Sequence, residues 1–372
     1  SIMFLEENYL MWLSRIEGIS LKKKDELIEY FGSAENIFCA SPLEIERFCN
    51  ANRINFKNII DIKEESILEE YINEIYKKGI KFISKYNKKF PSLLKNIPDP
   101  PLGIYVLGEL PNEKYNKVGV IGARRCTQYG AGNAYKFGKE LAEKGIVIVS
   151  GMALGIDSMA HKGAIDAKGK TIAVLGCGVD VVYPPSNKNL RDSIIENGCI
   201  ISEFAPSTPA FPAHFPIRNR IISGISDAII VVEAAKRSGT FITVGQALEQ
   251  GRDVFAIPGN INSPMSQGAN DLIKDCAFPL TEATDVLQNL GIYNKYFQPE
   301  EEELKEKEKK IKELLAPEEK LVYDCISELP ITIDEIILKT NSNIQTVQFG
   351  LTMLELKGYI KKLAGQKYIK NI

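Results

Sequence analysis

Three short turns rich in Gly, Ser and Thr carry the residue types that bind phosphate groups. They occupy residues 122–130, 150–157 and 238–240, and each follows a β-branched run and opens an amphipathic helix pattern. Glycine lets the backbone turn sharply, a helix N-terminus offers unbonded N–H groups, and the planar fork of Arg124 in the first turn can grip an oxyanion. One such turn commonly does no more than close a tight connection. Three of them, with an arginine among them, predict a phosphate-binding cleft.

A second group of candidates follows the fourth predicted strand, in residues 203–220. Its prolines exclude a helix, and Arg218, Asn219 and Arg220 then begin a helix that runs to Ile225. The two arginines do not share a helical face, so one of them can bind phosphate while the other is structural. Two interpretations of the aromatic side chains stay open: they are base-stacking platforms, or they cover the edge of the sheet. These aromatic residues are Phe204, Phe211 and Phe215.

No catalytic or metal-binding constellation can be assembled from the sequence. His161 lies one turn after Asp157, where packing on its own helix is the default interpretation, and His214 has no carboxylate near it in sequence. Residues 163–171 resemble a Walker A loop but have five residues between the glycines, where the loop requires four. Residues 175–180 begin like a dinucleotide fingerprint but lack its third glycine. We therefore predict no metal and no cofactor, and neither ATP hydrolysis nor NAD chemistry.

The elements that must position these turns lie in residues 117–290, where short β-branched runs alternate with amphipathic stretches. Continuous apolar strands separated by helices are typical of a parallel sheet that is covered on both faces. The sequence therefore predicts a doubly wound α/β domain, in which ligands bind beyond the carboxyl ends of the strands. The predicted strands are Val118–Ile121, Ile146–Val149, Thr171–Leu175, Cys199–Ser202, Ala228–Val232 and Val254–Ile257.

Two regions precede this core. Residues 1–75 keep the spacing of amphipathic helices and predict a small helical domain of the SAM or helix-hairpin-helix type. The turn at 16–20 resembles one that donates N–H groups to DNA, but Ser20 replaces its second glycine and the region has 15 acidic against 8 basic residues. A purely structural domain and a weak DNA contact both remain open. Residues 76–116 contain five prolines and predict a connector that packs on the core, with one strand candidate at Ile104–Leu107.

Two further regions follow the core. Residues 291–316 carry a charged run and predict a solvated helical linker. Residues 317–372 show three helical patterns closed by a short hairpin, which is the winged-helix pattern. Its recognition helix would fall within 340–356, where there is no Lys or Arg. Because a helix without cations holds phosphates poorly, we expect this domain to serve protein contact or autoregulation, with its wing as an auxiliary DNA site at most.

The composition excludes several classes of protein. The 372 residues carry 46 basic and 48 acidic side chains, a net charge of −2, so no global positive field attracts nucleic acid or membranes. The sequence predicts neither a membrane-spanning helix nor a signal peptide. The seven cysteines are odd in number and form no Cys-x-x-Cys pair. We expect a cytoplasmic protein without a disulfide framework or a zinc site.

The turns together resemble the DNA processing protein A family (DprA, also called Smf) of bacteria. The resemblance rests on VGVIGARRCTQYG, SGMALGIDSMAH, FPIRNRIISGISDAIIVVEA and SGTFITVGQALEQGRDVFAIPG, which stand in family order within residues 118–273. It implies an extended Rossmann-like core with a helical N-terminal domain and a C-terminal winged helix. The residues that the matched motifs imply as DNA phosphate ligands are Gly122, Arg124, Thr127, Ser150, Gly151, Gly155, Arg218, Arg220, Ser238, Gly239 and Thr240.

The resemblance implies a function without catalysis. It implies sequence-independent binding of single-stranded DNA, protection of incoming strands, loading of the RecA recombinase in natural transformation and recombination, and a homodimer. Leu154 is a departure, because many members have arginine at this position. The rival hypothesis is an enzyme that releases the base from nucleoside monophosphates, for which Glu249 is the acid/base candidate. A nucleotide-sensing module is a third hypothesis.

Overall fold

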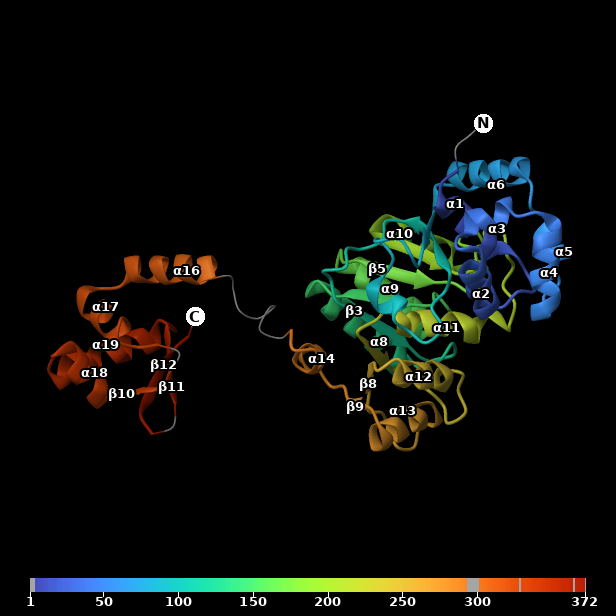
Figure 1. Ribbon diagram of the computed structural model, residues 1–372. Helices are drawn as coiled ribbons and strands as arrows, with labels where there is room; N and C mark the ends of the chain where they lie inside the picture. Colours follow the sequence, from blue (N-terminus) through green and yellow to red (C-terminus); the bar gives the residue numbers. More distant parts are fainter. Residues whose placement is uncertain (1–3, 293–300, 328, 364, 372) are drawn as a thin grey trace. The chain divides into compact units, whose positions relative to one another are not determined.

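The larger of two compact units is built on a nine-stranded sheet (Figure 1). The computed structural model describes residues 4–292, 301–327, 329–363 and 365–371, and its contacts divide the chain into Ser1–Leu290 and Gly291–Ile372. The strand order is β1-β2-β6-β5-β4-β3-β7-β8-β9, and the seven strands from β6 to β9 in this order run parallel. The strands are β1 (Ile80–Ser84), β2 (Gly103–Gly108), β3 (Lys117–Ile121), β4 (Val147–Ser150), β5 (Thr171–Val174), β6 (Gly198–Ser202), β7 (Ala228–Val231), β8 (Asp253–Ala256) and β9 (Phe278–Pro279).

The central strands form a parallel sheet because helices cover both of its faces. Every residue of β3, β4, β5 and β7 is buried, as their continuous apolar runs predict. Helices α8, α9 and α10 pack on one face, and α7, α11, α12 and α13 pack on the other. The predicted doubly wound fold is confirmed. The helices are α7 (Ser92–Lys95), α8 (Gln128–Glu143), α9 (Ile156–Asp166), α10 (Lys188–Asn197), α11 (His214–Gly224), α12 (Thr240–Glu249), α13 (Pro264–Asp275) and α14 (Ala283–Asn289), with a 3-10 turn at Pro185–Asn187.

The direction of the winding reverses at β3. From β3 the chain proceeds through β4, β5 and β6 on one side, and it then returns to add β7, β8 and β9 on the other side. The loops that leave β3 and β7 therefore diverge and open a crevice at the carboxyl end of the sheet, where doubly wound proteins bind their ligands. The crevices on either side of β3 are the places to look for a site.

The region expected as a connector contributes two strands to the sheet, and the strand candidate at Ile104–Leu107 is confirmed as part of β2. Residues 76–116 form both β1 and β2, and β2 pairs antiparallel with β6 at the edge of the parallel array. Four of the five prolines lie between these two strands, at 91, 98, 100 and 101, where they interrupt no ladder. The prolines therefore indicate the loop between β1 and β2, and not a connector over all of residues 76–116.

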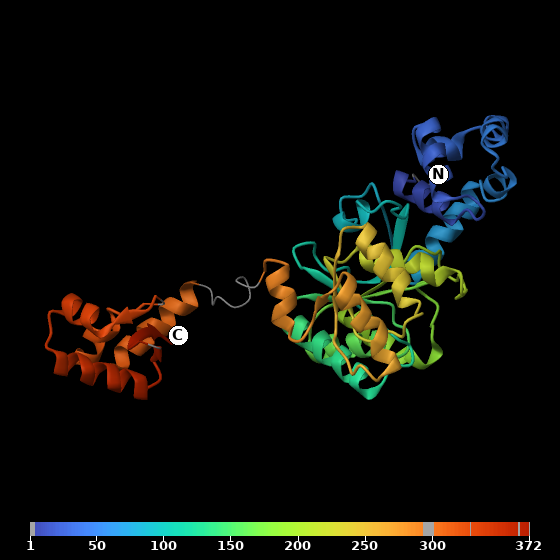
Figure 2. The ribbon, with the colours of Figure 1, turned by 90° about the horizontal axis from the view of Figure 1, so that it is seen from below.

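Six helices form the N-terminal part of the larger unit and gather at one end of the core (Figure 2). Ser41 caps α4 and Pro42 takes its first position, as this residue pair predicts. The helices are tied to the added strands, because Glu7 accepts hydrogen bonds from the N–H and hydroxyl of Ser84, and Ser14 bonds Tyr105 of β2. The helices are α1 (Glu6–Arg15), α2 (Leu21–Phe31), α3 (Ala34–Cys39), α4 (Pro42–Asn52), α5 (Lys57–Ile60) and α6 (Glu65–Lys77).

The smaller unit is a winged helix, as the sequence predicts. Its three-stranded sheet has the order β10-β12-β11, and β11 and β12 form the wing hairpin. Its elements are α16 (Glu301–Leu314), α17 (Pro317–Tyr323), β10 (Ile331–Thr332), α18 (Ile333–Thr340), α19 (Ile344–Leu356), β11 (Ile360–Leu363) and β12 (Lys367–Lys370). None of the helices that the structure describes in either unit is long and apolar enough to span a membrane.

Helix α16 differs from the solvated linker that its charges predict. Ile311 and Leu315 pack against the core of the winged helix, and Lys312 pairs with Asp324 at 2.7 Å. Lys370 of β12 also pairs with Glu308. The end of the charged run therefore belongs to the smaller unit. Residues 293–300 of the expected linker lie outside the described residues.

Candidate phosphate-binding pocket at the strand ends

The crevice between β3 and β7 is filled by a carboxylate of the protein itself. Glu233, which follows β7, is buried and accepts hydrogen bonds from the N–H of Thr127 at 2.9 Å and from its hydroxyl at 2.5 Å. A Cβ on Gly130 would lie 2.3 Å from Glu233 Oε2, so the carboxylate is seated directly on the first turn of α8. This negative charge satisfies the positive end of α8 and leaves no place there for an anionic ligand.

A small open pocket lies on the other side of β3, toward β4 and β5. Its volume is about 80 Å³, room for a group the size of a few water molecules, which occupy about 30 Å³ each. The turns after β3, β4 and β5 and the start of α11 contribute to it. The lining residues are Arg124, Gly151, Ala153, Leu154, Leu175, Gly176, Cys177, Tyr183, Pro184, Phe215 and Arg218.

Arg218 forms the inner wall of the pocket and is held by backbone carbonyls. Its Nη1 donates to the carbonyl oxygens of Gly151 at 2.9 Å and Val174 at 2.6 Å, and only 4% of the residue is exposed. A Cβ on residue 151 would lie 2.5 Å from Nη1, so any larger residue here would displace the guanidinium from this position. Burial lowers the pKa of Arg218 from its usual value; Asp157 opposes that effect and Arg124 adds to it. Neutral carbonyls thus orient the guanidinium without neutralising its charge.

Arg124 forms the outer wall and is exposed. Its guanidinium lies 4.9 Å from the ring centroid of Phe215, and that of Arg218 lies 5.7 Å from the same ring. Among the residues that the structure describes, Arg124 has no carboxylate partner. Two cations beside one aromatic ring, one of them without a carboxylate partner in the described part of the chain, create a local positive site in a protein of nearly neutral net charge.

A buried polar layer supports the pocket from below. Asp157 on α9 accepts hydrogen bonds from the N–H groups of Gly151 at 3.1 Å and Ala153 at 3.4 Å. These two N–H groups are therefore committed to the protein, and the arginines are the charged groups of the pocket that can bind an anion. Burial raises the pKa of Asp157, although Arg218 and these donors oppose the effect.

His161 lies one turn further along α9 and is fully buried. The hydroxyl of Thr171 donates to the carbonyl oxygen of Ile148, so it accepts from Nδ1 of His161 at 2.7 Å. Nε2 of His161 has no hydrogen-bond partner within the described part of the chain. Burial, with a contribution from Arg218, lowers the pKa of His161 to about 3. The imidazole is therefore neutral near pH 7 and has a structural role, in agreement with the interpretation that it packs on its own helix.

Gly155 brings the turns after β3 and β4 into contact. Its φ is +78°, in the region that favours glycine. A Cβ at this position would lie 2.5 Å from the carbonyl oxygens of Ala123 and Arg124. Gly155 thus sets the spacing of the two turns that frame the pocket and does not line the pocket itself.

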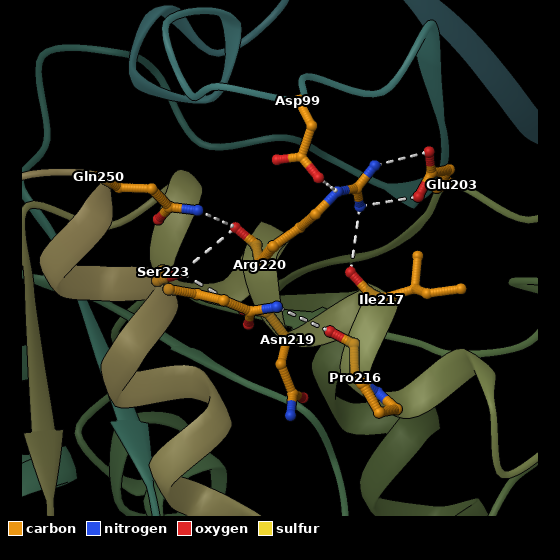
Figure 3. Close-up of polar contacts among 9 residues, drawn as sticks. Asp99, Glu203, Pro216, Ile217, Asn219, Arg220, Ser223 and Gln250 are labelled. Carbon is orange, nitrogen blue, oxygen red and sulfur yellow. Dashed lines mark hydrogen bonds and ion pairs between the residues drawn. The ribbon is translucent and has the colours of Figure 1, made fainter. Parts of the chain in front are cut away.

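Arg220 does not line this pocket and is bound by two carboxylates, as Figure 3 shows. Its Nη1 and Nη2 each donate to Glu203 at 2.8 Å, and its Nε donates to Asp99 at 3.0 Å. Burial opposes the charge, but Glu203 and Asp99 outweigh it and raise the pKa of Arg220. The two arginines of α11 therefore have opposite surroundings: carbonyls around Arg218 and carboxylates around Arg220.

Several predicted residues build the turns without lining the pocket. The hydroxyl of Ser150 donates to the carbonyl oxygen of Val120 at 2.6 Å, and that of Ser238 bonds Thr240 at 2.9 Å at the start of α12. Gly239 precedes α12, and Gly122 packs against Ile156 and the backbone of Glu233. The structure thus brings the first two turns together around the pocket and leaves the third turn outside it.

The pocket also contains residues that the sequence analysis did not select. Leu175, Gly176 and Cys177 follow β5, and Tyr183 precedes Pro184 in a cis peptide bond. Burial raises the pKa of Cys177 to about 11, so this thiol stays protonated near neutral pH. The sequence feature that could have indicated these residues is the stretch 175–180, which begins like a dinucleotide fingerprint. It fails as a motif, but it supplies the turn after β5.

The aromatic candidates separate into two groups. Phe215 lies inside the pocket, with Tyr183 at 5.7 Å. Phe204 stacks on His214, with ring centroids 4.0 Å apart and planes 12° apart, and Phe211 lies edge-on to the same imidazole. No group of three or more His, Cys, Asp or Glu side chains that could hold a metal ion occurs among the described residues.

These features define a class of protein: an α/β core with an arginine-lined pocket at its strand ends, in one chain with a winged helix. The sequence model of DNA recombination-mediator protein A matches residues 81–291, and that of the DprA winged-helix domain matches residues 306–366. The chain belongs to the DNA recombination-mediator protein A family, DprA/Smf, which confirms the resemblance in its motifs.

Similar proteins cover most or all of the chain. Protein Smf of Synechocystis is 30% identical, over 98% of this chain and 98% of its own. DprA of Bacillus subtilis is 42% identical, over 59% of this chain and 75% of its own. The crystal structure of DprA from Streptococcus pneumoniae has a TM-score of 0.65 at 33% identity and covers 77% of this chain and 98% of its own.

One solved relative is described by its ligand. A structure of DprA from Helicobacter pylori, whose title concerns a single-stranded DNA binding mode, has a TM-score of 0.51 at 30% identity. It covers 57% of this chain and 95% of its own. Family membership together with these structures makes a DNA-processing, recombination-mediator role the functional class of the chain.

Proposed function

We propose that this chain binds single-stranded DNA through its phosphates and that one phosphate is held between Arg124 and Arg218. The observation that carries the proposal is the pair of guanidinium groups at Phe215, of which one is exposed and the other is oriented by carbonyls. Guanidinium groups bind phosphate oxygens through charge-assisted hydrogen bonds. A backbone phosphate is common to every nucleotide, so this contact selects no sequence.

The proposal divides the candidate residues by task. Arg124, Gly151, Phe215 and Arg218 contact the strand, with Phe215 stacking on a base or sugar edge. The supporting residues hold the turns and the helix starts: Gly122, Thr127, Ser150, Gly155, Arg220, Ser238, Gly239 and Thr240. We leave Arg220 out of the contact set because two carboxylates already neutralise it.

The biological role follows the family. We infer that the chain protects single strands and loads a RecA recombinase onto them in recombination or transformation, that it works as a homodimer, and that it does so without catalysis. The rival enzyme would need an acid/base at the crevice beside β7, where Glu233 is already committed to Thr127. Glu249 is exposed on α12 and lines neither of the two cavities described here.

Fluorescence anisotropy tests the proposal. A labelled oligo-dT and its duplex with oligo-dA are each titrated with the wild-type protein, with Arg124→Ala and with Arg125→Ala. We expect wild type to prefer the single strand and Arg124→Ala to bind it about 1–3 kcal/mol more weakly, the cost of one charge-assisted contact. Arg125→Ala removes the same charge from a neighbouring exposed residue that does not line the pocket, and it should lose less.

The outcomes separate the hypotheses. Arg124 is exposed, so its variant should melt at the wild-type temperature; a large loss of stability would make Arg124 structural. No binding of oligo-dT by folded wild-type protein would reject the proposal. Release of free base from a nucleoside monophosphate, abolished by Glu249→Gln, would favour the enzyme.

A further inference from the structure

A second, much larger cleft lies in the same unit beside the phosphate pocket. Its volume is about 1570 Å³, above the roughly 300–1,000 Å³ of a typical small-molecule site. One wall is the turn after α1, residues 16–19, with Tyr71 of α6 nearby. The other wall is the proline-rich segment 203–217 that leads into α11. The cleft is thus formed jointly by the N-terminal helices and the core.

The cleft and the phosphate pocket meet at the start of α11. Phe215 lines the phosphate pocket, whereas its neighbours His214 and Pro216 line the cleft. The carbonyl oxygen of Gly176, another residue of the pocket, bonds Nδ1 of His214 at 3.1 Å. The two cavities are therefore neighbours, and a strand held by one phosphate at Phe215 lies next to the cleft.

The charges of the cleft do not favour phosphate. Arg220 is neutralised by Asp99 and Glu203, which flank its guanidinium in Figure 3. Lys24 is buried, and its Nζ donates to the carbonyl oxygen of Ser14 at 2.7 Å. Burial lowers the pKa of Lys24 to about 8, although Glu203 opposes the effect. Lys24 and Arg220 are thus already bound by groups of the protein, and the carboxylates of Asp99 and Glu203 lie beside Arg220.

The remaining cation of the cleft is also engaged. The guanidinium of Arg15 lies 3.8 Å from the ring centroid of Tyr71. Two further carboxylates, those of Glu17 and Asp61, line the same wall. A chain of phosphates would meet four carboxylates and three cations here, so phosphates are better placed in the solvent outside the cleft.

The aromatic side chains of the cleft are fixed and open to a ligand. His214 lies flat on Phe204 at 4.0 Å, and Phe211 stands edge-on to it at 5.2 Å with half of its surface exposed. Because Gly176 holds Nδ1 of His214, this cluster of three rings keeps its orientation. Fixed aromatic faces beside a phosphate grip are the arrangement that binds unstacked bases of a single strand.

We propose that this cleft receives the unstacked bases of the strand whose phosphate is held at Arg124 and Arg218. The inference rests on the proposed function and adds the N-terminal helices to the DNA-binding surface. It assigns bases to the cleft and phosphates to the pocket and the solvent. A duplex cannot enter, because its bases are paired and stacked on one another, so the cleft also contributes to selection of single strands.

Oligonucleotide length tests the inference. Oligo-dT of about 4 and about 16 nucleotides, the ends of the range of single-strand site sizes, are titrated with wild type, Phe211→Ala and Tyr76→Ala. Tyr76 is an exposed aromatic residue of α6 that does not line the cleft, so it is the matched control. We expect Phe211→Ala to weaken binding of the longer strand about tenfold and to bind the shorter strand like wild type. Tyr76→Ala should bind both strands like wild type.

Photocrosslinking gives an independent readout on the wild-type protein. An oligo-dT that carries 5-iododeoxyuridine is irradiated in the complex, and the modified peptides are mapped. Crosslinks at Phe204, Phe211 or Tyr71 are the expected result. If the Phe211 variant binds both lengths like wild type, or if crosslinks occur only at Phe215 and Tyr183, the inference is wrong while the proposed function stands. Failure of wild type to bind either length rejects the proposed function itself.

Discussion

The core and the winged-helix unit each contain the place where proteins of their fold usually bind a ligand. In the core this place is the pocket at the strand ends, and in the winged helix it is helix α19. Parallel α/β sheets bind ligands beyond their carboxyl ends, and winged helices read DNA with the helix that corresponds to α19. The pocket contains Arg124 and Arg218 without a carboxylate on either guanidinium in the described structure. Helix α19 has Glu355 as its one charged residue.

The difference teaches that fold indicates where a ligand can bind and charge decides whether it does. Lys357, the first cation after α19, is bound by Glu319 at 2.7 and 2.8 Å. The exposed side chains of α19 include Phe349 and Leu356, which suit contact with protein better than contact with phosphate. On the wing hairpin, Lys361, Lys362 and Lys367 are exposed.

If charge decides where the core binds DNA, then Arg218 binds phosphate and Arg220 stabilises the fold. Arg220→Ala tests this difference and has the largest expected effect. Removing Arg220 leaves Glu203, whose side chain is 15% exposed, without its partner. We expect the free energy of unfolding to fall by about 3–5 kcal/mol, the cost of breaking a buried ion pair from one side. Urea denaturation measures it, and adding Glu203→Gln should recover part of the loss. Unchanged stability with lost DNA binding would make Arg220 a direct ligand.

Acid sensitivity should also distinguish the two units, because both histidines lie in the core. The pKa of His161 is about 3 in the folded protein and about 6.5 unfolded, so below pH 6.5 the unfolded chain binds a proton that the native state does not. This contribution to stability is lost as pH falls, by about 2 kcal/mol between pH 7 and pH 5. Urea denaturation at both pH values measures it. The same loss in His161→Gln would assign the effect to other groups.

Leu154 offers a gain of function that sharpens the comparison. It lines the phosphate pocket and is about half exposed, so an arginine can extend there without burial. We expect Leu154→Arg to tighten binding of oligo-dT by about 1–2 kcal/mol through one further charge-assisted contact. Leu248→Arg, which places the same charge on an exposed residue outside both cavities, is the control. Equal gains in the two variants would show that net charge matters and the pocket does not.

The smallest effect is expected on the wing. Replacing both Lys361 and Lys362 by alanine should change oligo-dT affinity and stability by no more than about 0.5 kcal/mol, as for surface residues that lose no specific contact. Anisotropy and thermal melting measure the two quantities. A loss of binding as large as that of Arg124→Ala would contradict the assignment of DNA binding to the core.

The elements of the core could be predicted because their signals are local. The continuous apolar runs specify buried parallel strands, and the glycines after β3 and β4 specify the turns. The first added strand, β1, was missed because prolines after it suggested a connector. The docking of α16 was missed because two apolar residues, Ile311 and Leu315, are outnumbered by charges in their segment.

The sequence indicated that Arg218 and Arg220 could differ in role. Which of them is structural could not be predicted, because that depends on partners distant in sequence. Arg218 and Arg220 differ only through what they contact: Gly151 and Val174 for one, and Asp99 and Glu203 for the other. The commitment of Thr127 to Glu233, 106 residues later, is equally invisible in the local motif. A motif therefore identified the loops, and only the folded chain assigned the charges within them.

The salt dependence of oligo-dT binding tests the central claim most directly. The slope of log K against log salt concentration is about −0.7 for each phosphate neutralised on a single strand. The account predicts that Arg124→Ala makes this slope shallower by about 0.7, and that alanine at both Lys361 and Lys362 leaves it unchanged. A slope that is unchanged in Arg124→Ala and shallower in the wing variant would contradict it, because the phosphate contacts would then lie on the winged helix.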